Sequence, residues 1–190
     1  MKNENEIKTD SILFFDMDGT LVDTNYANFL SYKKAIEFVK KSDFNITYNP
    51  EQRFNRSLLK IAIPNLTKTE LEMIVKEKEK YYNDFLPETQ LNNKIIEILI
   101  KYCTSNKTVL VTNCRENRAL ATLNYHGLTD KFSDFFFRQF KESKKKINKF
   151  QNAILNLGIS ANLVIAFENE VTEIADAQSA GILIINPINL

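Results

Sequence analysis

The sequence has little cysteine, no excess of charge and no long apolar run, and each absence excludes a class of protein. Its 190 residues contain two cysteines, Cys103 and Cys114, too few for a disulfide framework, so a reducing interior is expected. With 25 basic and 24 acidic residues the formal charge is +1, so no overall field favours nucleic acid or anionic lipid. No apolar stretch approaches the roughly 18 residues of a membrane span or follows a signal-peptide pattern. We therefore expect a soluble cytoplasmic protein without nucleic-acid or membrane partners, either monomer or homodimer.

Short apolar runs are present instead, and they predict buried strands. They are continuous rather than alternating, which is typical of strands covered on both faces. These runs lie at 12–15, 108–112, 134–137, 163–167 and 182–185. Patterns with helical spacing lie between them, at 94–103, 116–127, 147–158 and 173–181. The alternation of strand and helix predicts an α/β core, with a mostly parallel sheet and helices on both faces.

Residues 24 to about 90 interrupt that alternation. They form successive amphipathic helical patterns without a convincing strand, and Pro50, Pro64 and Pro87 lie where such helices are expected to end. We therefore expect two domains. Residues 1–23 and 91–190 would form the α/β core, and residues 24–90 an inserted α-helical cap.

Polar side chains follow the predicted strands. In an open parallel sheet, ligands bind outside the carboxyl ends of the strands. An ammonium group is expected there from the lysines between 141 and 149, which follow the third strand. Such a rim of acids, a hydroxyl, a carboxamide and an ammonium suits a hard cation such as Mg²⁺ and a phosphoryl group. The other strands are followed by Asp16 and Asp18, by Thr112 and Asn113, and by the segment 168–173.

Asp16 and Asp18 are separated by one residue, so both side chains emerge on the same side of an extended segment. One carboxylate can attack while the other transfers protons. Gly19 permits a sharp turn beside a ligand, and Thr20 can form a hydrogen bond within that turn.

These residues belong to motifs that resemble those of the haloacid dehalogenase-like superfamily. ILFFDMDGTLVD at 12–23 resembles its first motif, DxDGTLxD after a hydrophobic strand, and LVTN at 110–113 resembles the second. The segments at 144–159 and 165–182 resemble the third, lysine-bearing motif and the acidic fourth motif. The inserted helices are similar to the type-1 cap of the β-phosphoglucomutase and phosphoglycolate phosphatase branch. The resemblance implies a Rossmann-like core and a Mg²⁺-dependent phosphatase that acts through a phosphoaspartate.

The resemblance also implies roles for the first two motifs. Asp16 would be the nucleophile and a Mg²⁺ ligand. Asp18 would act as general acid and then as base, with its backbone carbonyl on the metal. Thr112 would bind the transferring phosphoryl group and Asn113 would help to orient it. Cys114 is interpreted as a packing residue, because the sequence places no base partner for a thiol nucleophile.

The third and fourth motifs leave alternatives open. Lys144 fits the longer spacing of the third motif and is favoured over Lys146, which fits the shorter one; Lys149, at the predicted helix start, is a third candidate. In the fourth motif, Asn169 stands where the family has a metal-binding aspartate, and a carboxamide brings no charge. Glu168 and Glu173 are the acids that could compensate for it.

The sequence thus predicts a phosphohydrolase for a small phosphorylated metabolite. A phosphomutase that uses the same groups is the first alternative. The second is a catalytically weakened phosphoryl-binding or signalling protein, which Asn169 would favour. Residues in the cap that could contact the substrate are Tyr26, Phe29, Arg53 and Arg56.

Overall fold

The computed structural model describes residues 7–42, 44–138, 147–182 and 184–186, the last three by their backbone alone. The chain forms two compact units. The first combines Met1–Val22 with Leu91–Leu190, and the second is Asp23–Gln90. None of the helices in the described part of the chain combines the length and apolar character that a membrane crossing requires.

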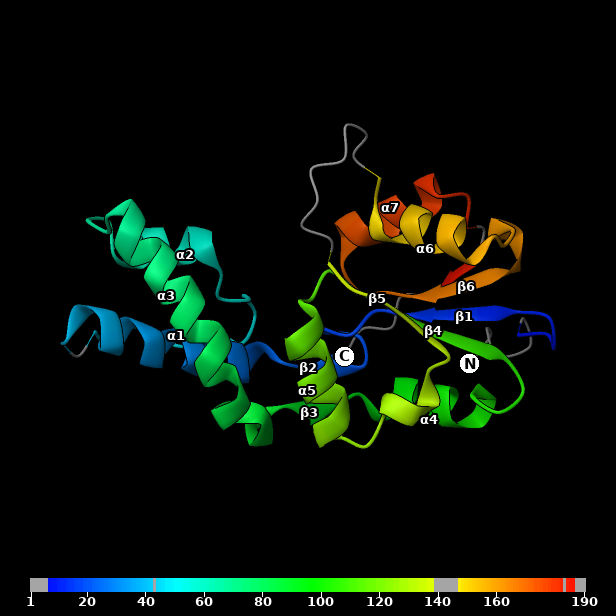
Figure 1. The fold of residues 1–190 in the computed structure, drawn as a ribbon, viewed down its shortest axis with the longest axis horizontal. Coiled ribbons are helices and arrows are strands. Elements are labelled where there is room, and N and C mark those ends of the chain that lie inside the picture. Colours follow the sequence, from blue (N-terminus) through cyan, green and yellow to red (C-terminus); the bar gives the residue numbers. More distant parts are fainter. Residues whose placement is uncertain (1–6, 43, 139–146, 183, 187–190) are drawn as a thin grey trace. The chain divides into compact units, whose positions relative to one another are not determined.

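The first unit contains a five-stranded sheet in the order β5-β4-β1-β6-β7 (Figure 1). Neighbouring strands pair in parallel, and the register places Phe15 beside Leu110 on one side and Phe167 on the other. The predicted parallel α/β core is therefore confirmed. Its strands are β1 (Ile12–Phe15), β4 (Lys107–Val111), β5 (Asp134–Phe136), β6 (Val164–Phe167) and β7 (Ile184–Asn186).

Helices cover both faces of this sheet, which explains why its strands are continuously apolar. All four residues of β1 are buried. Leu13 and Phe15 pack with α4 (Asn93–Tyr102) and α5 (Glu116–Tyr125), whereas Ile12 and Phe14 pack with α6 (Lys149–Leu157) and α7 (Val171–Ser179). Figure 1 shows these two pairs of helices on opposite sides of the sheet. Burying each such side chain contributes about 1.5–3 kcal/mol.

A capping box fixes the first residue of α6. The Asn148 side chain accepts the backbone N–H of Gln151 at 2.8 Å, and the Gln151 side chain accepts the N–H of Asn148 at 3.2 Å. Asn148 also donates to the backbone carbonyl of Asp176 in α7 at 2.8 Å. Such reciprocal bonds satisfy two donors that a helix start otherwise leaves open. Lys149 is therefore held at the start of α6.

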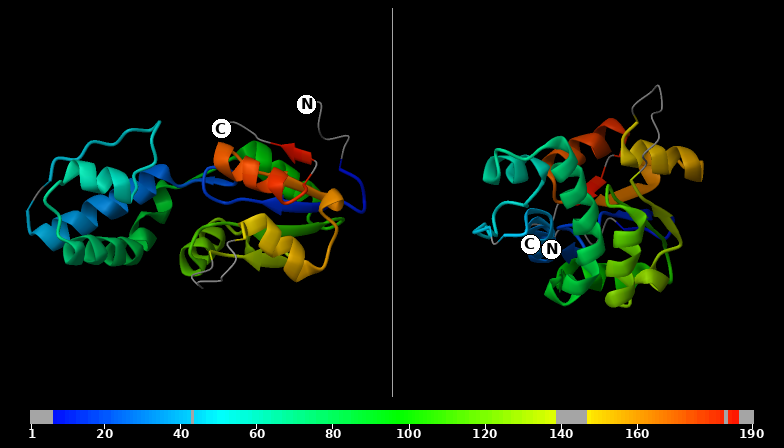
Figure 2. Two further views of the ribbon diagram at one scale, coloured as in Figure 1. Left: turned by 90° about the horizontal axis from the view of Figure 1, so that it is seen from above. Right: turned by 60° about the vertical axis from the view of Figure 1, so that its left-hand side comes forward.

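The second unit is helical. Its elements are α1 (Asn25–Lys40), α2 (Arg56–Ala62), α3 (Lys68–Tyr81) and the 3-10 helix η2 (Tyr82–Glu88). Helices α1 and α3 lie side by side (Figures 1 and 2). They share a core with α2 that includes Tyr32, Ile36, Leu59 and Ile74. Thr67 and Glu70 form a capping box that starts α3.

Short elements complete the chain. Strands β2 (Val22–Asp23) and β3 (Gln90–Leu91) pair as a two-stranded sheet where the chain passes between its units. The first unit also has two short 3-10 helices, η3 (Thr129–Lys131) and η4 (Ala161–Leu163). The sequence did not predict β2 and β3, because two residues are too few to show a periodic pattern.

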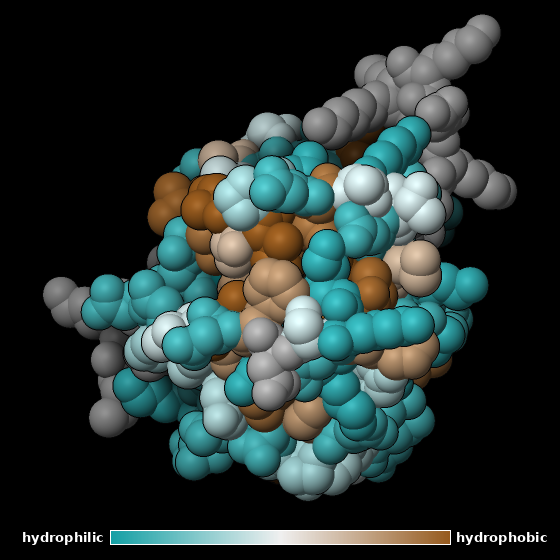
Figure 3. All heavy atoms as spheres, turned by 90° about the vertical axis from the view of Figure 1, so that its left-hand side faces the viewer, coloured by the Kyte–Doolittle hydropathy of each residue, from teal (hydrophilic) through white to brown (hydrophobic). Residues whose placement is uncertain are grey.

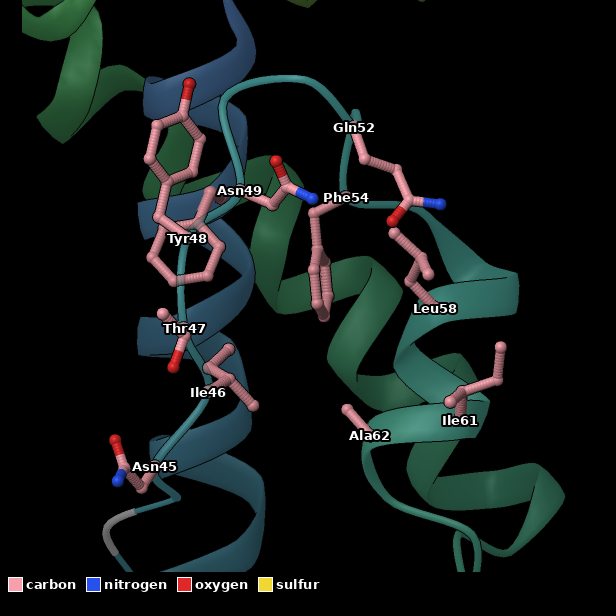
Figure 4. Close-up of a pocket in the computed structure, with 11 residues that line it drawn as sticks. Asn45, Ile46, Thr47, Tyr48, Asn49, Gln52, Phe54, Leu58, Ile61 and Ala62 are labelled. Carbon is pink, nitrogen blue, oxygen red and sulfur yellow. The ribbon is translucent and has the colours of Figure 1, made fainter.

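A hollow of about 290 Å³ lies within the second unit. Its apolar lining comes from Phe29 of α1, from residues 46–54 and from α2. Figure 4 shows Ile46 and Tyr48 facing Leu58 and Ile61 across Phe54. Figure 3 looks onto this unit and shows apolar residues at the surface among hydrophilic ones. Ile61 of α2 has 72% of its surface exposed.

Candidate functional site

Polar side chains gather where the central strands end. The hydrogen-bond ladder continues one residue past β1 and β4, because Asp16 donates its N–H to Phe167 at 3.0 Å and Thr112 donates to Phe136 at 2.9 Å. Both residues are buried. Glu168 directly follows β6 and is also buried. The carboxyl edge of the sheet therefore carries these three side chains side by side.

One ammonium group joins three carboxylates at this edge. Nζ of Lys149 lies 2.7 Å from Oδ1 of Asp16, 2.7 Å from Oε2 of Glu168 and 3.1 Å from Oε2 of Glu173. The Lys149 side chain is 5% exposed. Since the capping box holds the start of α6, the lysine that reaches Asp16 projects from a fixed helix end.

The balance of charge in this cluster is negative. Burial lowers the pKa of Lys149, but the three neighbouring carboxylates outweigh burial and leave that pKa above its usual value. Burial raises the pKa of Asp16, and the attraction of Lys149 offsets this only in part. Burial, followed by repulsion from Asp16, likewise raises the pKa of Glu168 to about 7. Since one ammonium faces three carboxylates, Lys149 does not fully neutralise its partners, and the cluster can accept further positive charge.

Both carboxylate oxygens of Glu168 have partners. Oε2 binds Lys149, and Oε1 accepts the backbone N–H groups of Asn169 and Glu170, each at 2.9 Å. Glu168 therefore orients Lys149 and shapes the loop before α7.

Asn169 lies against the turn that follows Asp18. Its Oδ1 accepts a hydrogen bond from the Thr20 hydroxyl at 3.0 Å. Gly19 has a φ of 86°, and a Cβ at this position would lie 2.7 Å from Nδ2 of Asn169. Glycine is required here by both the backbone conformation and the close approach.

Glu173 connects α7 with the end of β4. Its Oε1 accepts a hydrogen bond from Nδ2 of Asn113 at 2.7 Å. Its Oε2 is buried and, within the described residues, has no hydrogen-bond partner, although it forms the ion pair with Lys149. A buried carboxylate oxygen in this state is suited to a cation.

The donors at this edge fit Mg²⁺. Within the described ranges, no three His, Cys, Asp or Glu side chains are already arranged around one metal position. Mg²⁺ does not need such a cage, because it commonly binds one or two carboxylates together with water and substrate phosphate. Oxygen donors of this kind are available from the carboxylates of Asp16 and Glu173 and from the carboxamide of Asn169.

Lys144, the favoured candidate for the lysine of the third motif, and Lys146 both lie outside the described residues. Among the described residues, Lys149, the third candidate, is the lysine that pairs with Asp16. Its position at the first residue of a capped helix was a usable signal, because an N-terminal helix residue stays close to the sheet edge from which the loop departs.

Arg118 was missed by the sequence analysis. It lies in the first turn of α5, and its Nη2 is 2.8 Å from Oδ2 of Asp18. Its Nε donates to Sγ of Cys114 at 2.9 Å. The backbone N–H of Cys114 in turn donates to Oγ1 of Thr112 at 3.1 Å. One signal could have indicated Arg118. It lies in the first turn of α5, the helix that follows β4, and this helix begins at the edge of the sheet where Asp18 lies.

The four candidate substrate-contacting residues belong to the second unit. Arg53 donates from Nη1 to Thr24 at 3.0 Å and to Asn25 at 2.9 Å. Tyr26 and Phe29 are stacked and both contact the ring of Tyr48. Arg56 is the exposed first residue of α2.

Comparisons with known proteins agree with this architecture. The family model of the haloacid dehalogenase-like hydrolases matches residues 13–186. The comparison with curated proteins gave no match.

Similar solved structures include a haloacid dehalogenase-like family hydrolase from Streptococcus pneumoniae, which is 19% identical (TM-score 0.70, 92% of this chain and 83% of that chain). A predicted phosphoglycolate phosphatase from Haemophilus somnus is 21% identical (TM-score 0.73, 92% and 84%). CbbY from Rhodobacter sphaeroides, solved in complex with phosphate, is 16% identical (TM-score 0.73, 94% and 86%). At these identities the likeness concerns the fold.

Proposed function

Because the chain belongs to the haloacid dehalogenase-like hydrolase family, we propose that it is a cytoplasmic, Mg²⁺-dependent phosphatase of a small phosphorylated metabolite, acting through an aspartyl-phosphate. The observation that carries the proposal is the position of Asp16. This carboxylate stands at the end of the central strand, buried, with one oxygen held by Lys149.

The first step transfers the phosphoryl group to Asp16. Lys149 engages Oδ1, so Oδ2 attacks phosphorus and the bond from phosphorus to the leaving oxygen breaks. Asp18 gives its proton to that oxygen, which leaves as an alcohol. Covalent transfer divides one difficult displacement into two easier ones.

The second step returns Asp16 to its starting state. Asp18, now ionised, takes a proton from water as the water oxygen attacks phosphorus. The bond between phosphorus and Asp16 breaks, and inorganic phosphate leaves. The same carboxylate thus acts first as acid and then as base.

Thr112 and Lys149 hold the oxygens of the phosphoryl group. The Thr112 hydroxyl oxygen accepts the N–H of Cys114, which directs the hydroxyl proton toward another acceptor, a role that a phosphoryl oxygen can fill. The Lys149 ammonium is close enough to Asp16 to stabilise negative charge as it develops during the attack. Asn113 acts indirectly in this account, since its amide holds Glu173.

Mg²⁺, when bound, would offset the charge of the phosphoryl oxygens. Asp16, the Asp18 carbonyl and Asn169 would hold it, and Glu173 would add the second carboxylate. Glu168 contributes by orienting Lys149, because both of its oxygens already have partners.

The second unit would serve as the cap that reads the leaving group. The names of the similar structures, a phosphoglycolate phosphatase and a protein bound to phosphate, support a small phosphate ester as substrate. Tyr26, Phe29 and Arg56 are the candidates for contact. Arg53 is a weaker candidate, because Thr24 and Asn25 already accept hydrogen bonds from its guanidinium.

One observation favours a second function, a phosphoryl-binding protein with little turnover. Asn169 supplies a neutral oxygen where the family has a metal-binding aspartate, and that oxygen already accepts a bond from Thr20. Weak Mg²⁺ binding together with no turnover on any phosphoester would favour this alternative.

The test is a panel of phosphoesters assayed with Mg²⁺. We expect turnover of at least one ester by the wild type and a loss of several orders of magnitude in Asp16→Asn, since the covalent step has no substitute. Asp130→Asn is the matched control, because this exposed carboxylate pairs with Lys131 at the surface. Equal turnover by Asp16→Asn and the wild type would reject the mechanism.

A further inference from the structure

Arg118 holds a second carboxylate at the sheet edge. Its Nη2 lies 2.8 Å from Oδ2 of Asp18, and the two side chains are 13% and 17% exposed. The partners are 100 positions apart in the sequence. An ion pair of an arginine with a carboxylate in a partly buried place is stronger and more directional than a surface pair.

The guanidinium is fixed from a second side. Nε of Arg118 donates to Sγ of Cys114, whose side chain is buried. The planar group is thus held by two acceptors on different edges, which restricts its rotation. The backbone of Arg118 has a side-chain partner as well, since its carbonyl accepts a hydrogen bond from the Thr122 hydroxyl at 2.9 Å.

A turn sets the backbone around Asp18, and Arg118 contacts its side chain. Gly19 donates its N–H to the Val22 carbonyl at 2.8 Å, and Leu21 and Val22 both donate to the Met17 carbonyl. These bonds place the Asp18 backbone but do not orient its carboxylate.

We propose that Arg118 is a positioning residue for Asp18, and that Cys114 keeps Arg118 in place. The proposal rests on the proposed function, in which Asp18 transfers protons. By holding Oδ2, Arg118 fixes the orientation of the carboxylate that gives a proton to the leaving oxygen and takes one from the attacking water. The segment from Thr112 to Arg118 then controls both the phosphoryl-binding hydroxyl and the proton-transfer carboxylate.

Steady-state kinetics of Arg118→Met and Arg118→Lys, with the ester that the wild type hydrolyses best, test this role. We expect Arg118→Met to lower kcat by about 10- to 100-fold with KM little changed, because misplacing a reacting group by about 1 Å costs a factor of that size. Arg118→Lys keeps a cation and should recover part of kcat. Cys114→Ala removes only the second anchor and should lower kcat less than Arg118→Met does.

A double-mutant cycle separates positioning from a structural role. If Arg118 acts through Asp18, adding Arg118→Met to Asp18→Asn should cause no further loss of kcat, whereas a merely structural role would add its loss in both backgrounds. Additive losses, a change confined to KM, or a kcat within twofold of the wild type would overturn the proposal. If Arg118→Met fails to fold, as judged by its thermal midpoint, the same cycle with Arg118→Lys decides. Asp16→Asn, measured in parallel, shows independently whether the proposed function holds.

Discussion

Nζ of Lys149 lies 2.7 Å from Oδ1 of Asp16 and belongs to the first residue of a capped helix. The lysine therefore reaches the end of β1 from the loop-to-helix junction beside α7, and it meets two further carboxylates there. This arrangement has consequences for stability and for activity that can be separated by mutation.

Lys149→Met should abolish most activity and destabilise the protein. Removing one partner of a buried ion pair leaves uncompensated charge and costs about 3–5 kcal/mol. Chemical denaturation measures the free energy of unfolding. Lys107→Met is the control, because Lys107 pairs with Asp134 near the surface and its loss should cost under about 1 kcal/mol. Equal costs for the two variants would contradict the account.

Asn169→Asp should strengthen Mg²⁺ binding by roughly tenfold. The change adds a negative charge just after the end of β6. The Thr20 hydroxyl can donate a hydrogen bond to an aspartate at this position as it does to the asparagine. About 1.4 kcal/mol of added attraction corresponds to that factor. Isothermal titration calorimetry of wild type, Asn169→Asp and the control Asn156→Asp measures it. Asn156 is an exposed residue of α6 whose amide bonds Asn152 in the same helix. Unchanged or weaker binding by Asn169→Asp would exclude this residue from the metal site.

Glu168 should make the metal-free protein less stable as the pH rises. Its folded pKa, about 7, lies above the ordinary value of 4.5, so the folded state retains a proton that the unfolded state loses. The resulting stabilisation is complete below pH 4.5 and disappears as the pH rises through about 7. At about 1.4 kcal/mol per pKa unit, the change is at most about 3.5 kcal/mol.

Glu168→Gln removes this titration while keeping the shape of the side chain. With a chelator present, the unfolding free energy of the wild type minus that of Glu168→Gln should fall between pH 4.5 and 7.5. A difference that stays constant or grows across this interval would show that the Glu168 pKa is not raised.

Gly19→Ala should destabilise more than Gly127→Ala does. Both glycines have positive φ, 86° and 67°, so each alanine meets the same kind of backbone strain, about 1–2 kcal/mol. Only at position 19 would the new Cβ also meet a neighbour, Nδ2 of Asn169 at 2.7 Å, whereas nothing lies within 4 Å at position 127. The difference between their unfolding free energies measures that contact, and equal values would contradict it.

The strands could be predicted because burial on both faces produces continuous apolar runs. The runs at 134–137 and 163–167 agree closely with β5 and β6. The last run begins earlier than its strand, since Ile182 is buried and donates its N–H to Ala177 of α7, so it closes that helix. The ion pairs within the site could not be predicted from the sequence. Arg118 pairs with Asp18, and Lys149 with Asp16, through long side chains from two different helices. A local sequence pattern contains no information on such distant contacts.

Asp16 is the residue that carries the phosphoryl group in the proposed mechanism. Acid-quenched reaction mixtures, with peptide mass spectrometry of wild type and Asp18→Asn, measure this. We predict one added phosphoryl group on the peptide that contains Asp16. With an ester whose leaving group needs no proton, Asp18→Asn should accumulate more of it, because transfer to Asp16 then proceeds without the acid while the water attack lacks its base. Turnover by the wild type with no modification at Asp16, or with the phosphoryl group on another residue, would contradict the central claim.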